Sequence, residues 1–158
     1  MQLHSGMSKN LLIIYHSQKG HTEQLARASM QGAEKENDIS IRFQKAFETH
    51  LEDILWADGL IIATPEYFGN MSGAVKDFFD RTYYPARELE VNLPYALIIC
   101  CDNDGTGAER NIQTIAASYV LRKSLDTVII KEKNISEEIE KATELGQTFA
   151  AGISLGIF

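Results

Sequence analysis

Three uncharged, apolar runs, at residues 11–15, 60–63 and 95–101, constrain the fold of this chain most strongly. None of them alternates apolar with polar residues, which is typical of strands buried on both faces of a parallel sheet. Residues 39–43 do alternate, and this pattern indicates a strand with one wetter face at an edge of the sheet. The chain is therefore expected to fold around a largely buried parallel sheet.

Amphipathic segments follow the strands and predict helices between them. The helix after the first strand is expected at residues 22–33. The second buried strand, residues 58–64, is expected to end at Pro65, because proline removes a backbone donor. Ser72 is a suitable N-cap for the next helix, which is expected to end at residues 83–85.

The last strand is predicted at residues 125–130 and is followed by a final amphipathic helix. Strands that alternate with helices from end to end predict an α/β fold. Specifically, we expect a flavodoxin-like, doubly wound, five-stranded parallel sheet of order 2-1-3-4-5 with helices on both faces. Residues 7–158 are expected to form a single domain, and residues 1–6 resemble a leader.

Charge and cysteine content exclude several classes of partner. The formal net charge of −7 disfavours nucleic acid and anionic membranes as partners. No apolar segment is long enough to span a bilayer. The two cysteines, Cys100 and Cys101, are adjacent and cannot close a useful loop, and a metal site needs more ligands than they offer. A reduced, cytoplasmic setting without a bound metal is therefore expected.

The most unusual loops follow three strands that should be neighbours. They are residues 17–22, 65–70 and 102–107. In a doubly wound sheet, ligands bind beyond the carboxyl ends of the strands, where the strand order reverses. These loops are therefore expected to form one composite site.

Each loop suggests a different part of the ligand. Residues 17–22 offer hydroxyls, a lysine and the first amides of a helix, which suit a phosphate, although neither the GxGxxG nor the GxxxxGK[ST] spacing is present. Tyr67 and Phe68 suit stacking on a flat ring, and Gly69 permits close approach of the backbone. Residues 102–107 suit the polar edge of such a ring. Together these parts describe flavin mononucleotide (FMN).

The segment 64–73, Thr-Pro-Glu-Tyr-Phe-Gly-Asn-Met-Ser-Gly, resembles the second flavin loop of WrbA-type quinone reductases and NAD(P)H-dependent FMN reductases. Residues 17–22 resemble the phosphate loop of flavodoxin-like proteins more generally. The resemblance implies an oxidoreductase that passes electrons from NAD(P)H through FMN to a quinone or similar small acceptor. It leaves a homo-oligomer possible, although the insertions that support WrbA tetramers are absent. It assigns no catalytic side chain, since the flavin supplies the chemistry.

The residues that the resemblance and the loop chemistry assign to the cofactor are Ser17, Lys19, Gly20, His21, Thr22, Pro65, Glu66, Tyr67, Phe68, Gly69, Asn70, Asp102, Asn103, Asp104, Gly105 and Gly107. The first five would hold the phosphate, and the others would line the ring. Nothing in the sequence pairs the histidine of the first loop with a carboxylate. The acids Glu66, Asp102 and Asp104 are expected to lower the flavin potential if they point at the ring.

Three other functional classes share parts of this sequence pattern. A flavodoxin-type electron carrier would share the fold and the cofactor but would have no substrate of its own. A signalling receiver would need an aspartate where Thr64 stands and acids where His16 and Ser17 stand. A Cys-x5-Arg phosphatase is excluded, because the required arginine is replaced by Thr106 or Gly107.

Overall fold

The computed structural model describes residues 8–158, so the leader expected at residues 1–6 lies outside the described residues. The strands are β1 (Lys9–Tyr15), β2 (Ile39–Lys45), β3 (Gly59–Tyr67), β4 (Asn70–Met71), β5 (Leu93–Cys101), β6 (Leu121–Lys123) and β7 (Val128–Lys131). The α-helices are α1 (His21–Ala33), α2 (Leu51–Trp56), α3 (Gly73–Glu88), α4 (Thr106–Tyr119) and α5 (Ile135–Ser154). Two short 3-10 helices, η1 (Ala46–Glu48) and η2 (Glu132–Asn134), follow β2 and β7.

The main sheet is parallel, and its strand order is β2-β1-β3-β5, followed by β6 and β7. The last two strands pair with different parts of β5 and together occupy the fifth position. The predicted order 2-1-3-4-5 is therefore confirmed. The short strand β4 pairs antiparallel with β3 and forms a hairpin beyond the sheet.

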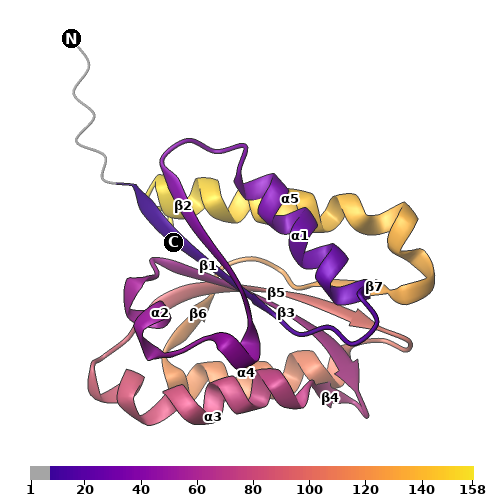
Figure 1. The fold of residues 1–158 in the computed structure, drawn as a ribbon, viewed down its shortest axis with the longest axis horizontal. Coiled ribbons are helices and arrows are strands. Elements are labelled where there is room, and N and C mark those ends of the chain that lie inside the picture. Colours follow the sequence, from indigo (N-terminus) through magenta and orange to yellow (C-terminus); the bar gives the residue numbers. More distant parts are fainter. Residues whose placement is uncertain (1–7) are drawn as a thin grey trace.

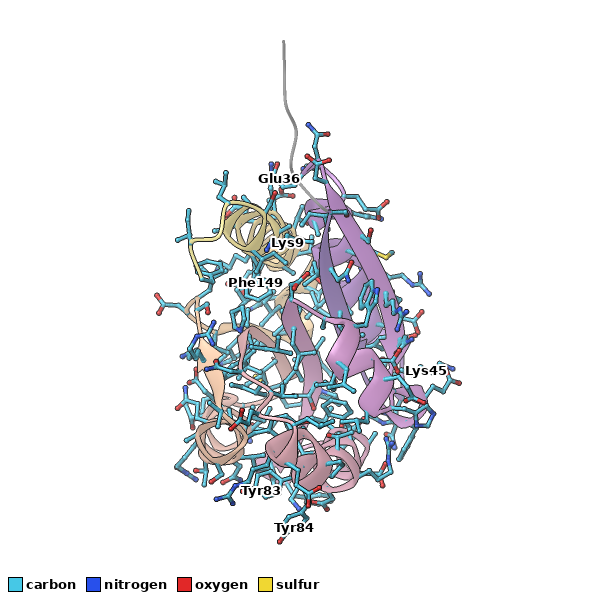
Figure 2. The ribbon with its side chains drawn as sticks, turned by 90° about the vertical axis from the view of Figure 1, so that its left-hand side faces the viewer. Lys9, Glu36, Lys45, Tyr83, Tyr84 and Phe149 are labelled. Carbon is cyan, nitrogen blue, oxygen red and sulfur yellow. The ribbon has the colours of Figure 1, made fainter. Side chains whose placement is uncertain are left out.

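Helices cover both faces of the sheet, as Figure 1 shows. Leu11 and Ile13 of β1 belong to the core under α1 and α5, whereas Leu12 and Ile14 belong to the core on the opposite face. Figure 2 shows Phe149 directed from α5 into the first of these cores. This burial on both faces explains why the strand sequences do not alternate.

The predicted end of the second buried strand was wrong, because β3 continues through Pro65 to Tyr67. The ladder between β1 and β3 ends at the pair of Tyr15 and Ala63, so β1 needs no N–H donor from Pro65. A proline is tolerated in a strand where the side on which its N–H is missing has no neighbouring strand to bond to.

Two further boundaries also differ from expectation. Helix α3 continues through Pro85 to Glu88. Ala86, the residue after Pro85, is completely buried. The last strand begins earlier than residue 125, as β6, and is interrupted before β7. The interruption starts where the Ser124 N–H bonds to the Tyr95 carbonyl, 3.0 Å away.

Candidate functional site

The carboxyl ends of β1, β3 and β5 meet at one edge of the sheet, and a cavity of about 190 Å³ opens there. Eight of the predicted site residues line it: Ser17, Lys19, His21, Thr22, Pro65, Glu66, Tyr67 and Asp102. Gln18, Cys100, Cys101 and Glu132 also line it and were not predicted. The remaining predicted residues, Gly20, Phe68, Gly69, Asn70, Asn103, Asp104, Gly105 and Gly107, lie in the same loops but not on the cavity wall.

The loop between β1 and α1 leaves the start of the helix open to an anion. Gly20 takes a left-handed conformation, with φ of 95°, and its N–H donates to the Ser17 hydroxyl at 3.0 Å. The first helical bond runs from the Gln24 N–H to the Gly20 carbonyl, 3.0 Å away. Among residues 8–158, no side-chain hydrogen bond is made at the N-cap of this helix, and the positive end of its dipole faces the cavity.

The second loop is a tight hairpin rather than an irregular loop. Tyr67 pairs with Asn70, and the two residues between them both have positive φ, 53° for Phe68 and 70° for Gly69. This combination is typical of a type I′ turn, which fits the twist of the two strands. Phe68 is fully exposed at the tip. A left-handed conformation in a bulky aromatic residue costs free energy, and such strain is typical of functional sites.

The base of the hairpin is fixed by two buried hydroxyls. The Thr64 hydroxyl accepts from the Ser72 N–H at 3.1 Å and donates to the Pro65 carbonyl at 2.8 Å. The Ser72 hydroxyl in turn accepts from the Val75 N–H at 3.3 Å, so Ser72 caps α3 as the sequence predicts. The hairpin is therefore held against both β3 and α3.

Glu66 joins the second loop to the third. Its two carboxylate oxygens accept from the N–H groups of Gly105, at 3.2 Å, and Ala108, at 3.0 Å, at the start of α4. Both oxygens of Glu66 are therefore already engaged by backbone N–H groups of the chain. These bonds instead tie the hairpin to the helix, where the dipole favours a negative charge.

Asp104 is engaged within its own loop. Its carboxylate accepts from the backbone and the hydroxyl of Thr106, at 3.0 and 2.9 Å, and these bonds lower the pKa of Asp104. The side chain is exposed and lies off the cavity wall. Asp102 is thus the one acid of the predicted three that lines the cavity without such a bond among residues 8–158.

Glu132 is the most informative residue that the sequence analysis missed. It follows β7 directly, so its position at the carboxyl edge could have been inferred from the end of the last strand. Its Oε1 lies 3.5 Å from Nδ1 of His21, which makes the expectation that His21 has no carboxylate partner wrong. The contact is an ion-pair distance without hydrogen-bond geometry, and Nδ1 of His21 has no other partner among the described residues.

Burial sets the protonation of several groups around the cavity. It raises the pKa of Cys100 to about 11, and the charge of Glu132 adds to this effect. Burial also raises the pKa of Cys101 to about 11 and that of Tyr67 above its ordinary value. His16, whose ring meets that of Tyr67 edge-on at 6.3 Å between centroids, has its pKa lowered by burial. The thiols are therefore neutral at pH 7.

The family described as NADPH-dependent FMN reductase matches residues 24–132, more than half of the chain. The chain belongs to this family. The predicted resemblance is therefore confirmed at the level of the family.

Individual relatives of this FMN reductase family member are more distant. An NAD(P)H dehydrogenase (quinone) from Acidithiobacillus ferrooxidans is 35% identical and covers 46% of this chain and 46% of that protein. A flavodoxin from Aquifex aeolicus is 36% identical over 44% of this chain and 38% of its own length. The match thus spans less than half of either relative. A WrbA-like flavodoxin from Agrobacterium tumefaciens shares the fold, with a TM-score of 0.78 and 20% identity over 94% of this chain and 99% of that one.

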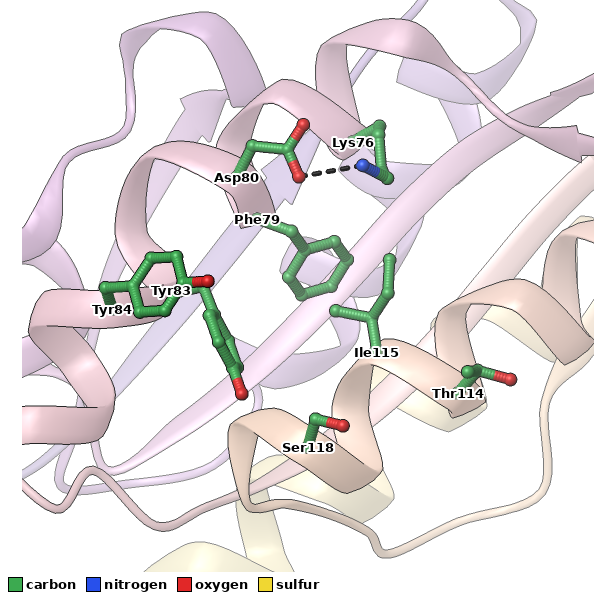
Figure 3. Close-up of a pocket in the computed structure, with 8 residues that line it drawn as sticks. All are labelled: Lys76, Phe79, Asp80, Tyr83, Tyr84, Thr114, Ile115 and Ser118. Carbon is green, nitrogen blue, oxygen red and sulfur yellow. Dashed lines mark hydrogen bonds and ion pairs between the residues drawn. The ribbon is translucent and has the colours of Figure 1, made fainter.

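A second cavity of this family member, about 470 Å³, lies between α3 and α4, and Figure 3 shows its lining. Apolar and aromatic side chains dominate it, including Phe79, Tyr83 and Ile115, and a 2.7 Å ion pair joins Lys76 to Asp80 beside it. None of the three predicted loops contributes to this cavity. Within residues 8–158, no helix is long and apolar enough to cross a membrane, and no three potential ligands gather into a metal site.

Proposed function

We propose that this chain binds FMN at the carboxyl edge of its sheet and is an oxidoreductase that uses NAD(P)H to reduce a quinone-like acceptor. The observation that carries the proposal is the convergence of the uncapped start of α1 and the exposed hairpin on one cavity. The first suits a phosphate and the second suits a flat ring. Membership of the FMN reductase family supports the same cofactor.

The residues of the cavity fit the two parts of FMN. Ser17, Lys19 and the first amides of α1, at His21 and Thr22, would hold the phosphate. Gly20 would contribute by its conformation, because its positive φ turns the loop toward the helix. These amides are available to a phosphate, because no side-chain hydrogen bond is made at the N-cap of α1 among the described residues.

The ring would lie against the hairpin in the cavity lined by Tyr67 and Asp102. Pro65, Tyr67, Phe68, Gly69 and Asn70 would form one wall, and residues 102–107 the other. When bound, FMN supplies two-electron transfer between NAD(P)H and an acceptor. The chain itself positions the ring, and the buried base of the hairpin keeps that wall rigid. No side chain is assigned as an acid or a base.

A flavodoxin-type electron carrier is the second candidate. It is supported by the name of the Aquifex relative and by the net charge of −7, which suits docking to basic protein partners. The hairpin sequence favours the enzyme, because it resembles the reductases rather than the carriers.

Several broader expectations remain part of this proposal. We propose that residues 7–158 act as one domain, that the partners are small molecules and not nucleic acid, and that the chain is cytoplasmic and can form a homo-oligomer. The neutral, unpaired thiols of Cys100 and Cys101 support the reducing compartment.

Steady-state oxidation of NADPH with a benzoquinone acceptor separates the two candidates. We expect turnover that requires FMN and the folded protein, without any added reductase. Heat-unfolded protein with the same FMN is the control, because free flavin alone can mediate slow electron transfer. A protein that binds FMN but does not turn over under these conditions is an electron carrier.

A further inference from the structure

The carboxylate of Glu132 lies in the cavity where the proposed function places the phosphate of FMN. It lines the same cavity as Ser17, Lys19 and Thr22. It is brought there by β7, whose last pair joins Lys131 to Cys101 at the end of β5. An acid beside a phosphate site works against binding, because like charges repel.

Glu66 is hydrogen-bonded and Asp102 is exposed to solvent, whereas Glu132, within residues 8–158, is neither. Both oxygens of Glu66 accept N–H bonds from the start of α4. Asp102 is exposed to solvent, which screens its charge. Within the described part of the chain, Glu132 accepts no hydrogen bond, and its one ionic contact is to His21. Two-thirds of its side chain is withdrawn from solvent.

The charge of Glu132 also reaches both walls of the cavity. After burial, it is the next cause that raises the pKa of Tyr67 on the hairpin side and of Cys100 at the end of β5. A phosphate in a cavity of about 190 Å³ would lie well within the Debye length of roughly 8 Å at physiological salt. Salt would therefore screen the repulsion only in part.

From this geometry we propose that Glu132 is a specificity-determining residue that weakens the binding of the FMN phosphate by residues 17–22. The inference rests on the proposed function and adds to it a residue of this chain that sets how tightly the phosphorylated flavin is held. Glu132 discriminates by charge, since it opposes a phosphorylated flavin and leaves riboflavin, which has no phosphate, unaffected. Glu132 also contacts Nδ1 of His21, which would otherwise be free to face the phosphate.

The test compares FMN and riboflavin affinities, by quenching of flavin fluorescence, in the full-length wild type, Glu132→Gln and Glu140→Gln. Glu140 is exposed on α5, and its substitution changes the net charge equally without touching the cavity. We expect Glu132→Gln to tighten FMN by about tenfold, as for one like charge removed at close range, and riboflavin by less than twofold. Glu140→Gln should leave both affinities within twofold of the wild type.

Competition by inorganic phosphate gives a second readout that does not involve the ring. Glu132→Gln should lower the inhibition constant of inorganic phosphate by about the same factor as the FMN dissociation constant, and Glu132→Ala should behave alike. Unchanged or weaker FMN binding in both variants overturns the role of Glu132, while FMN binding by the wild type leaves the proposed function intact. If the wild type binds neither flavin, the proposed function fails and this inference fails with it.

Discussion

At the scale of single residues, the closest approach at the site is between the hairpin and α4. A Cβ atom added at Gly107 would lie 2.1 Å from the Gly69 carbonyl oxygen, which is backbone and cannot rotate away. The absence of a side chain at Gly107 therefore lets α4 support the tip of the hairpin. The same contact gives the segment Gly105-Thr106-Gly107, whose sequence is not distinctive, a structural role beside this site.

Gly107→Ala is expected to push the hairpin from α4 and to lower the free energy of unfolding by about 2 kcal/mol, as overpacking does. FMN affinity should fall in parallel. Gly73→Ala is the matched control, because a Cβ there meets nothing within 4 Å. Urea denaturation and flavin titration measure both effects, and equal stabilities of the two variants would contradict the close contact.

The buried thiols are expected to make the free energy of unfolding depend on pH. The pKa of Cys100 and Cys101 is about 11 in the folded chain but about 8.5 in an unfolded one. Between these values the unfolded state has lost protons that the folded state keeps, so stability falls as the pH rises from about 9 to 11. Unfolding free energies at pH 7 and 10 should show this loss, and a Cys100→Ala, Cys101→Ala variant should lose less. Rapid reaction of either thiol with iodoacetamide at pH 8 would show that the thiols are not protected.

At the scale of elements, the hairpin of β3 and β4 combines strain with exposure. Phe68 is left-handed and fully exposed, so folding alone gives no reason for a phenylalanine there. The sequence predicted the stacking chemistry of this segment but not its hairpin geometry. Proline at position 65 argues against a strand, and only the end of β1 at Tyr15 removes the conflict.

Phe68→Asn should relieve the strain and raise the stability by about 1 kcal/mol, since asparagine tolerates positive φ. The same change should weaken FMN binding severalfold, because the stacking surface is lost. Glu90→Asn is the control: Glu90 is exposed, has φ of 56°, and precedes β5 at the opposite edge of the sheet. It should gain stability without a change in flavin affinity. An unchanged FMN affinity in Phe68→Asn would remove Phe68 from the site.

The roles of Glu66 and Glu132 show where sequence patterns stop being informative. Both are acids beside buried strands, and the sequence gives no sign that the first accepts bonds from the amides of α4 while the second accepts no hydrogen bond within residues 8–158 and only contacts His21. That difference depends on which N–H groups lie within about 3 Å, and such distances follow from the packing of helices far apart in the chain.

At the scale of the whole molecule, the pattern of buried strands and helices was sufficient to predict the architecture. Apolar runs without alternation require helices on both faces, and the alternating second strand belongs at an edge, as β2 does. These constraints are redundant, so errors of a few residues at Pro65 and Pro85 did not change the topology. The location of the site at the reversal of strand order follows from that topology alone.

Titration of the purified full-length chain with FMN, followed by flavin fluorescence and absorbance, tests most directly whether the three loops form one flavin site. We expect saturable binding of one FMN per chain, with quenching as the ring stacks on the hairpin, and weaker binding in Gly107→Ala. A folded protein whose fluorescence titration shows no saturation with FMN would contradict the flavin site and leave only the fold and the family.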